Sequence, residues 1–147
     1  MTTKPEVAVA ILYQGEGFLM QLRDDIPGIA YPGYWGLFGG HLEPGESPAA
    51  AVRRELLEEI AYAPPHLELF RRFEAEAVIR HVFHGPLGVP VESLCLQEGW
   101  DLDLWTMTDV QRGDRYSNRA AQVRPIGPPH QQILLSFLGH RRIEQAI

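Results

Sequence analysis

The chain begins with two short, mainly apolar stretches on either side of a Gly-Glu-Gly turn, a pattern that predicts a β-hairpin. The expected strands are Glu6–Gln14 and Phe18–Arg23. A loop rich in Pro and Gly follows at Asp24–Tyr34. Trp35–Phe38 is then predicted as a short extended segment that leads into a pair of glycines.

Apolar residues next recur at helical spacing, which predicts a helix over Pro48–Ala61. Ser47 suits the N-cap position and Pro48 suits the first helical position. The helix must end before Pro64-Pro65, because proline cannot continue it. The apolar stripe that we expect to pack against a sheet consists of Ala49, Val52, Leu56 and Ile60.

The second half of the chain predicts further strands and a closing helix. Asp109 marks a short turn or helix, and Gly113–Pro129 is polar and is predicted to be irregular. An amphipathic helix is expected over Pro129–Ala146. Strands on both sides of a central helix predict one α/β domain, residues 1–147, with a sheet between helices. The four expected strands are Leu67–Glu76, Ala77–His84, Glu92–Leu96 and Leu102–Met107.

Composition narrows the functional classes. A chain of 147 residues fits a single domain, and its net charge of −6 argues against a stable complex with nucleic acid. It does not exclude nucleotides, because a bound metal ion supplies positive charge locally. Twelve of the 13 cationic residues are Arg and the only Lys is Lys4, which excludes a P-loop and argues against Schiff-base chemistry.

The single cysteine, Cys95, allows no internal disulfide and no cysteine-based zinc cluster. We expect it to be a buried strand residue. No secretory signal is visible, and the apolar run Val7–Tyr13 is too short to span a membrane, so we expect a cytoplasmic protein.

The strongest chemical signal is a group of three carboxylates. On a helix, Glu55, Glu58 and Glu59 point within roughly 100° of one another. Their mutual repulsion calls for a compensating charge, and the usual one is a hard divalent cation with oxygen ligands. Mg²⁺ commonly binds through one or two carboxylates together with substrate phosphates. The pattern therefore indicates metal-assisted chemistry on a phosphorylated substrate.

The stretch Gly40–Tyr62, which contains these carboxylates, resembles the Nudix box, the signature of the Nudix hydrolases and of their MutT-like members. One position departs from the pattern, since Ala61 stands where the box has Gly, which puts the tight exit from the helix in question. The positions in register are Gly40, Glu46, Arg54, Glu55, Leu56, Glu58 and Glu59.

The resemblance implies an α/β/α sandwich with a mixed sheet. It also implies hydrolysis of a nucleoside diphosphate linked to another group, with Mg²⁺, or Mn²⁺, neutralising the diphosphate. By the same resemblance, Glu58 and Glu59 are metal ligands and Glu55 is a ligand or a water-orienting base. The carbonyl of Gly39 or of the next glycine completes the coordination. Arg54 holds these carboxylates in place, with Glu46 as its partner.

Outside the box, Glu98 precedes a strand that ends in an aromatic residue, Trp105. Nudix proteins often place an additional metal-binding or base-like Glu in such a loop, and an exposed turn carboxylate is the equally weighted alternative. Arg23 is a candidate for binding polar groups of the substrate. Tyr31 and Tyr34 are candidates for stacking on a base.

The remaining candidates divide into core and surface. Trp35 and Phe38 are expected in the core. On a strand, His81 and His84 point to opposite faces, so they form a poor metal pair and are interpreted as hydrogen-bonded strand residues. Two roles stay open for Arg80: contact with a phosphate, or a position on an outer, solvated face.

Several substrates stay open: ordinary or oxidised nucleoside triphosphates, nucleotide sugars, ADP-ribose and dinucleoside polyphosphates. A non-catalytic Nudix module that senses a nucleotide is the main alternative, although such modules tend to lose the box glutamates. An isopentenyl diphosphate isomerase activity requires a reactive cysteine near the glycine loop, and Cys95 lies far from it in sequence. A homodimer is left open.

Overall fold

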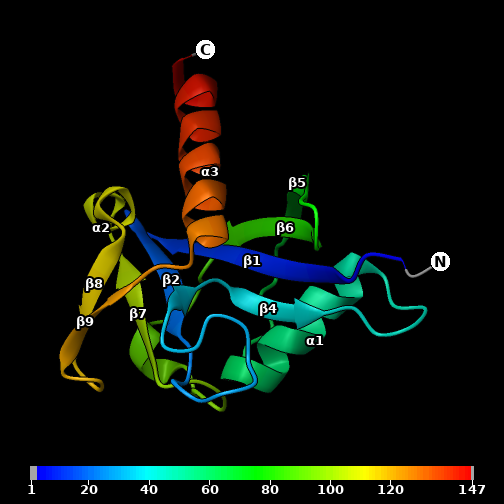
Figure 1. The fold of residues 1–147 in the computed structure, drawn as a ribbon. Coiled ribbons are helices and arrows are strands. Elements are labelled where there is room, and N and C mark those ends of the chain that lie inside the picture. The colour runs from blue at the N-terminus through cyan, green and yellow to red at the C-terminus, as the bar shows by residue number, and fades with distance from the viewer. Residues whose placement is uncertain (1–2, 147) are drawn as a thin grey trace.

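The computed structural model describes residues 3–146 as a mixed β-sheet with helices on both faces (Figure 1). In chain order the strands are β1 (Glu6–Gln14), β2 (Gly17–Leu22), β3 (Trp35–Gly36), β4 (Phe38–His41), β5 (Glu68–Glu74), β6 (Ile79–Pro86), β7 (Asp101–Trp105), β8 (Asp114–Ser117) and β9 (Gln122–Pro125). The α-helices are α1 (Pro48–Ile60), α2 (Met107–Arg112) and α3 (Pro128–Ala146), and Val91–Ser93 forms one 3₁₀ turn.

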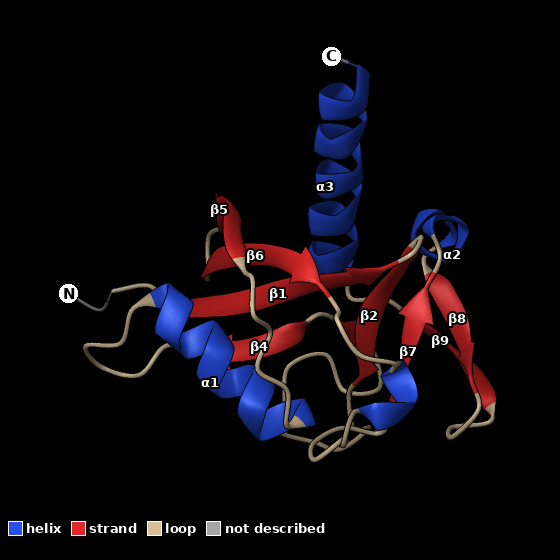
Figure 2. Cartoon of the chain, turned by 180° about the vertical axis from the view of Figure 1, so that it is seen from behind, coloured by secondary structure: helices blue, strands red, loops and turns tan. Residues whose placement is uncertain are grey.

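Strand β1 is the centre of the sheet. It pairs in parallel with β6 on one side, and on the other side it pairs antiparallel with β4 and with β2. Strands β3 and β7 extend the sheet beyond β2, and β5 extends it beyond β6. Helix α1 lies on one face and α3 lies on the other (Figures 1 and 2). The predicted α/β/α sandwich with a mixed sheet is therefore confirmed.

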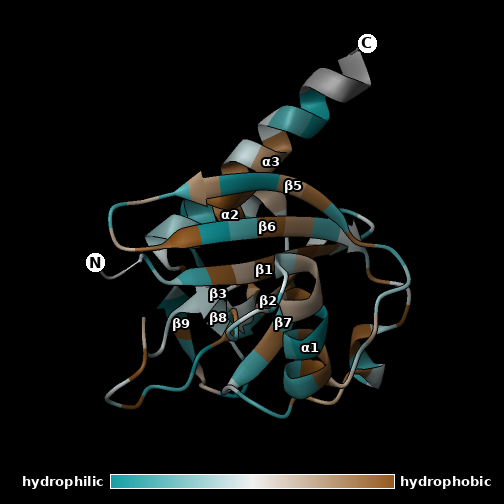
Figure 3. Ribbon diagram, turned by 90° about the vertical axis from the view of Figure 1, so that its right-hand side faces the viewer, coloured by the Kyte–Doolittle hydropathy of each residue, from teal (hydrophilic) through white to brown (hydrophobic). Residues whose placement is uncertain are grey.

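Alternation along β1 builds two cores at once, because successive side chains on a strand point to opposite faces. Ala8, Ala10 and Leu12 pack toward α1, whereas Val9 and Ile11 pack toward α3. Hydrophobic and hydrophilic segments accordingly alternate along both the strands and α1 (Figure 3). The α1 residues in the first core are Ala51, Val52, Leu56 and Ile60, so the predicted stripe is confirmed except for Ala49, which is exposed.

The strand predicted over Glu92–Leu96 is wrong. This segment forms the 3₁₀ turn and then an irregular run along the end of α1. The Cys95 N–H donates to the Ile60 carbonyl at 3.4 Å, and the Gln97 N–H donates to the Glu59 carbonyl at 2.8 Å. The segment thus satisfies carbonyls that the last turn of a helix leaves without partners, instead of pairing in the sheet. Cys95 is exposed as a result, not buried as expected.

The segment Gly113–Pro129, predicted to be irregular, contains the two-stranded sheet of β8 and β9. The hairpin is joined to the core through Trp35, which is fully buried as predicted. The indole Nε1–H donates to the Arg115 carbonyl at 3.3 Å, and Trp35 also forms a β-bridge with Ile126. No helix among residues 3–146 is long and apolar enough to cross a membrane.

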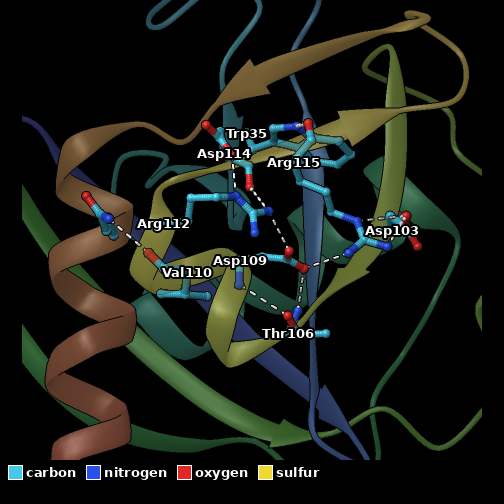
Figure 4. Close-up of polar contacts among 9 residues, drawn as sticks. Trp35, Asp103, Thr106, Asp109, Val110, Arg112, Asp114 and Arg115 are labelled. Carbon is cyan, nitrogen blue, oxygen red and sulfur yellow. Dashed lines mark hydrogen bonds and ion pairs between the residues drawn. The ribbon is translucent and has the colours of Figure 1, made fainter.

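A network around Asp109 fixes α2 against the neighbouring strands (Figure 4). Asp109 and Thr106 form a reciprocal capping box, with N–H to oxygen distances of 2.8 and 3.1 Å. The Asp109 carboxylate also accepts bonds from Arg112 at 2.7 Å and from Arg115 at 2.6 Å. Burial alone would raise the pKa of Asp109, but these bonds outweigh it and lower the pKa to about 2.

We expect Asp109→Asn to lower the free energy of unfolding by about 1–2 kcal/mol at pH 7. Because the folded-state pKa lies below the ordinary value of 3.8, the carboxylate stabilises the fold above pH 3.8, and this contribution is lost as the pH falls toward 2. Urea unfolding at several pH values measures it. The difference between the variant and the wild type should shrink in that window. Glu76→Gln, in an exposed turn, is the control.

Helix α1 ends on Ala61, which adopts the left-handed conformation with φ 53° and ψ 38°. Its N–H donates to the Leu57 carbonyl at 3.1 Å. The tight exit that the family pattern assigns to Gly is therefore retained with Ala, despite the unfavourable contact of its Cβ in this conformation.

Ala61→Gly should raise the free energy of unfolding by about 1 kcal/mol, because Gly adopts this conformation without strain. Ala63→Gly provides the matched control two residues further on, where φ is not positive. There Gly only adds freedom to the unfolded chain and should lower stability. Equal destabilisation of both variants in urea unfolding would show that the left-handed conformation of Ala61 is not strained.

Candidate active site

A cleft of about 700 Å³ opens where β4, the start of β1 and α1 meet the loops that follow β2 and precede β7. Its lining combines carboxylates with two arginines and two histidines. The polar residues that line it include Gln21, Arg23, Asp24, Glu55, Glu59, Arg80, Gln97, Glu98 and His130.

The glycine pair places β4 against the carboxylates. Gly39 has φ 148°, and a Cβ there would collide with the Ala8 carbonyl oxygen of the paired strand. A Cβ on Gly40 would lie 2.5 Å from the carboxyl carbon of Glu55. Gly39 therefore lets β4 pair closely with β1, and a larger residue at position 40 would displace the Glu55 carboxylate.

Glu59 is the most buried carboxylate of the three, at 3% exposure. Its Oε1 accepts the Gly39 N–H at 2.9 Å, which fixes the side chain toward β4. Burial raises the pKa of Glu59 to about 8, and the negative charges of Glu55 and Glu98 add to the effect. Burial also raises the pKa of Glu55, against the opposing effect of Arg54. The site therefore disfavours the ionised form of both carboxylates unless further positive charge is brought to it.

Arg54 organises the carboxylates from outside the cleft. Its Nε and Nη2 donate to the two oxygens of Glu46 at 2.8 and 3.0 Å, as the sequence predicted. Its Nη1 donates to Glu55 at 3.0 Å and to Glu58 at 3.2 Å. This fork of two bonds between Arg54 and Glu46 lowers the pKa of the Glu46 carboxyl to about 2 and raises the pKa of Arg54. These bonds fix the loop around Glu46 and the carboxylates of Glu55 and Glu58 relative to one another.

Not every predicted site residue lines the cleft. The Glu58 side chain is half exposed, pairs with Arg54 and is not part of the cleft lining. Glu98 does line the cleft, and its loop is held by a bond from Gln21 Nε2 to the Glu98 carbonyl at 2.8 Å. Tyr34 does not line it, but it packs edge-to-face on Tyr31, which does.

The histidines of β6 lie outside the cleft, in accordance with their interpretation as strand residues. His81 pairs with Glu6 at 2.7 Å, and His84 stacks on Tyr13. Arg80, from the same strand, lines the cleft. His130 is a residue that the sequence did not single out. It comes from the first turn of α3, about 90 residues from the glycine pair, and only the tertiary fold brings it there.

Comparison with known proteins agrees with the sequence signature and the fold. The sequence model of the NUDIX domain family matches residues 2–121 of this chain. An 8-oxo-dGTP diphosphatase of Escherichia coli is 48% identical over 44 residues, and the match spans 30% of this chain and about a third (34%) of that protein. The chain belongs to the Nudix family.

Solved structures give the same fold. The NUDIX domain of Shewanella oneidensis NrtR, in complex with ADP-ribose, superposes with a TM-score of 0.71 at 20% identity, covering 97% of this chain and 90% of that one. A MutT NUDIX hydrolase from Burkholderia pseudomallei gives a TM-score of 0.67 at 16% identity, covering 88% of this chain and 95% of that one.

Arg54→Lys should lower the free energy of unfolding by roughly 1–2 kcal/mol, because Lys keeps the charge but cannot form the fork to Glu46 while also bonding Glu55. Arg53→Lys is the matched control, since the neighbouring Arg53 donates through one nitrogen to the Pro64 carbonyl at 2.7 Å. Urea unfolding of both variants measures the difference. An equal response would show that the fork is not needed.

Proposed function

We propose that this protein is a Mg²⁺-dependent pyrophosphohydrolase that cleaves a nucleoside diphosphate linked to another group. The observation that carries the proposal is the buried Glu59, fixed by the Gly39 N–H beside Glu55 in a cleft of nucleotide size. The ionised form of Glu59 is costly at this burial unless a cation compensates it.

The donor chemistry of the cleft fits Mg²⁺. Glu55, Glu59 and Glu98 offer carboxylate oxygens from the lining of the cleft, and the Gly39 carbonyl lies on β4. Mg²⁺ commonly takes one or two protein carboxylates and completes its coordination with waters and substrate phosphates. In the described part of the chain no three His, Cys, Asp or Glu side chains are gathered closely enough to enclose a metal ion.

When bound, Mg²⁺ or Mn²⁺ would supply charge neutralisation of the diphosphate and a more acidic water. The residues of the chain do the rest. Arg54 keeps Glu55 and Glu58 oriented, and the Gly39 N–H keeps Glu59 oriented. Glu55 or Glu98 accepts the proton of the attacking water, and Arg23 binds an anionic part of the substrate. Positioning and charge stabilisation provide the catalytic effect, as expected for phosphoryl transfer.

Two substrate classes are favoured among the nucleotides. Similarity to the 8-oxo-dGTP diphosphatase supports nucleoside triphosphates, ordinary or oxidised, whereas the fold of the NrtR domain supports ADP-ribose and related nucleotide sugars. A purely sensing module is disfavoured, because every box glutamate is retained.

Glu55→Gln and Glu59→Gln should each reduce turnover roughly 100-fold or more while leaving the fold intact. Glu58→Gln should also reduce it, through the loss of a metal ligand. The assay is phosphate or pyrophosphate release from a nucleotide panel with Mg²⁺, Mn²⁺ or chelator. Glu92→Gln, an exposed carboxylate outside the cleft, should be unaffected. Full activity in the first three variants would exclude the assignment.

A further inference from the structure

Two arginines, Arg23 and Arg80, line the cleft. Neither Arg23 nor Arg80 forms an ion pair among residues 3–142, and the Nε of Arg23 is buried without a hydrogen-bond acceptor. Arg80 is partly buried, and this burial lowers its pKa. Both side chains can only donate hydrogen bonds, so they prefer a ligand group that accepts them.

His130 adds a third donor, because its tautomer is fixed. The Leu37 N–H donates to His130 Nδ1 at 3.0 Å, so Nδ1 is an acceptor and carries no proton. A neutral imidazole must then carry its proton on Nε2. Burial, together with the charges of Arg80 and Arg23, lowers the pKa of His130 to about 4 and keeps the ring neutral at pH 7.

The ring of His130 is also held in place. Its atoms lie 3.4 Å from where a Cβ on Gly36 would stand and 3.3 Å from the corresponding position on Gly127. These glycines therefore let the imidazole lie flat on the backbone at the edge of the cleft. Among the described residues none accepts a hydrogen bond from Nε2, which leaves this donor for a ligand.

An apolar wall lies in the same cleft. Ile26, Ile29, Ala30 and Tyr31 from the loop after β2 line it together with Val9 and Val78. A flat ring with polar atoms on its rim fits a space that combines an apolar wall with hydrogen-bond donors. In a nucleotide that part is the base, whereas the carboxylates of the same cleft suit phosphates that are bound through a metal ion.

We propose that His130 Nε2–H, assisted by Arg80, selects bases that carry a ring carbonyl, at position 6 of a purine or position 4 of a pyrimidine. The proposal rests on the proposed function for its substrate class. An exocyclic amino group at the same position would place donor against donor and leave the protein groups without acceptors. One such mismatch at a base edge corresponds to roughly a 10- to 100-fold preference.

Binding of dIMP and dAMP tests the inference without hydrolysis, because neither contains an anhydride bond. The two differ in the 6-oxo and 6-amino groups and in the proton that the 6-oxo form carries on N1. Titration calorimetry with the wild type should show dIMP bound at least about 10-fold more tightly. dUMP and dCMP form a second pair and should show the same order. Equal affinities within both pairs, or no binding of any of the four, would overturn the proposal.

Two substitutions of His130 separate the role of its Nε2–H donor from that of Nδ1, which accepts the Leu37 N–H. In His130→Asn the amide oxygen can replace Nδ1 as acceptor for Leu37, but the Nε2 donor is lost, so the preference should fall to within about 3-fold. In His130→Gln the amide nitrogen can replace Nε2, so the preference should persist even if stability falls. His140→Asn, on the exposed part of the same helix, should behave as the wild type. A full preference in His130→Asn would contradict the role of Nε2.

Turnover of dITP and dATP with Mg²⁺ separates this inference from the proposed function. Equal kcat/KM for the two substrates would leave the hydrolase standing and remove base selection by His130. A binding preference for dIMP without hydrolysis of any nucleotide would support base selection by His130 and exclude the hydrolase. The comparison uses the wild type, so it holds even if a variant fails to fold.

Discussion

The repulsion between three carboxylates on one turn of α1 is the constraint on which the rest of the site depends. The fold compensates each of them differently. Glu58 is half exposed and pairs with Arg54, Glu55 shares the same guanidinium, and Glu59 is buried against the Gly39 N–H. Of the three carboxylates, Glu58 keeps the most contact with solvent. The other two lie where burial raises their pKa, so the proposed cation would stabilise their ionised forms.

The sheet turns this helical feature into a cleft that combines carboxylates, cationic groups and apolar side chains. Strand β4 lies close to Glu55 of α1 because Gly40 has no Cβ, and its pairing with β1 fixes its position. The loop after β2 and the first turn of α3 complete the walls on the other side. A nucleotide matches this combination, since its phosphates suit carboxylates that hold a metal ion and its base suits an apolar surface with polar groups at the rim.

The local parts of the structure were predictable because the signals that define them are local. Ser47 and Pro48 mark the start of α1, the helical spacing identifies its buried face, and the Gly-Glu-Gly turn marks the first hairpin. The Arg54–Glu46 pair was also predictable from the box. The errors lie where the partner is distant in sequence. The segment around Cys95 has the composition of a strand, but it bonds to the end of α1 because those carbonyls lack partners.

The sequence by itself determined the family, the sandwich of helices and sheet, and the carboxylates of the box, because these depend on fixed spacing within one stretch of chain. The tertiary structure alone decided which of these carboxylates is buried, that Tyr31 and not Tyr34 lines the cleft, and that His130 joins it. Those properties depend on how separate elements pack. The protonated nitrogen of His130, for example, is set by the Leu37 N–H, 93 residues away in the chain. No pattern of spacing near either residue carries that information.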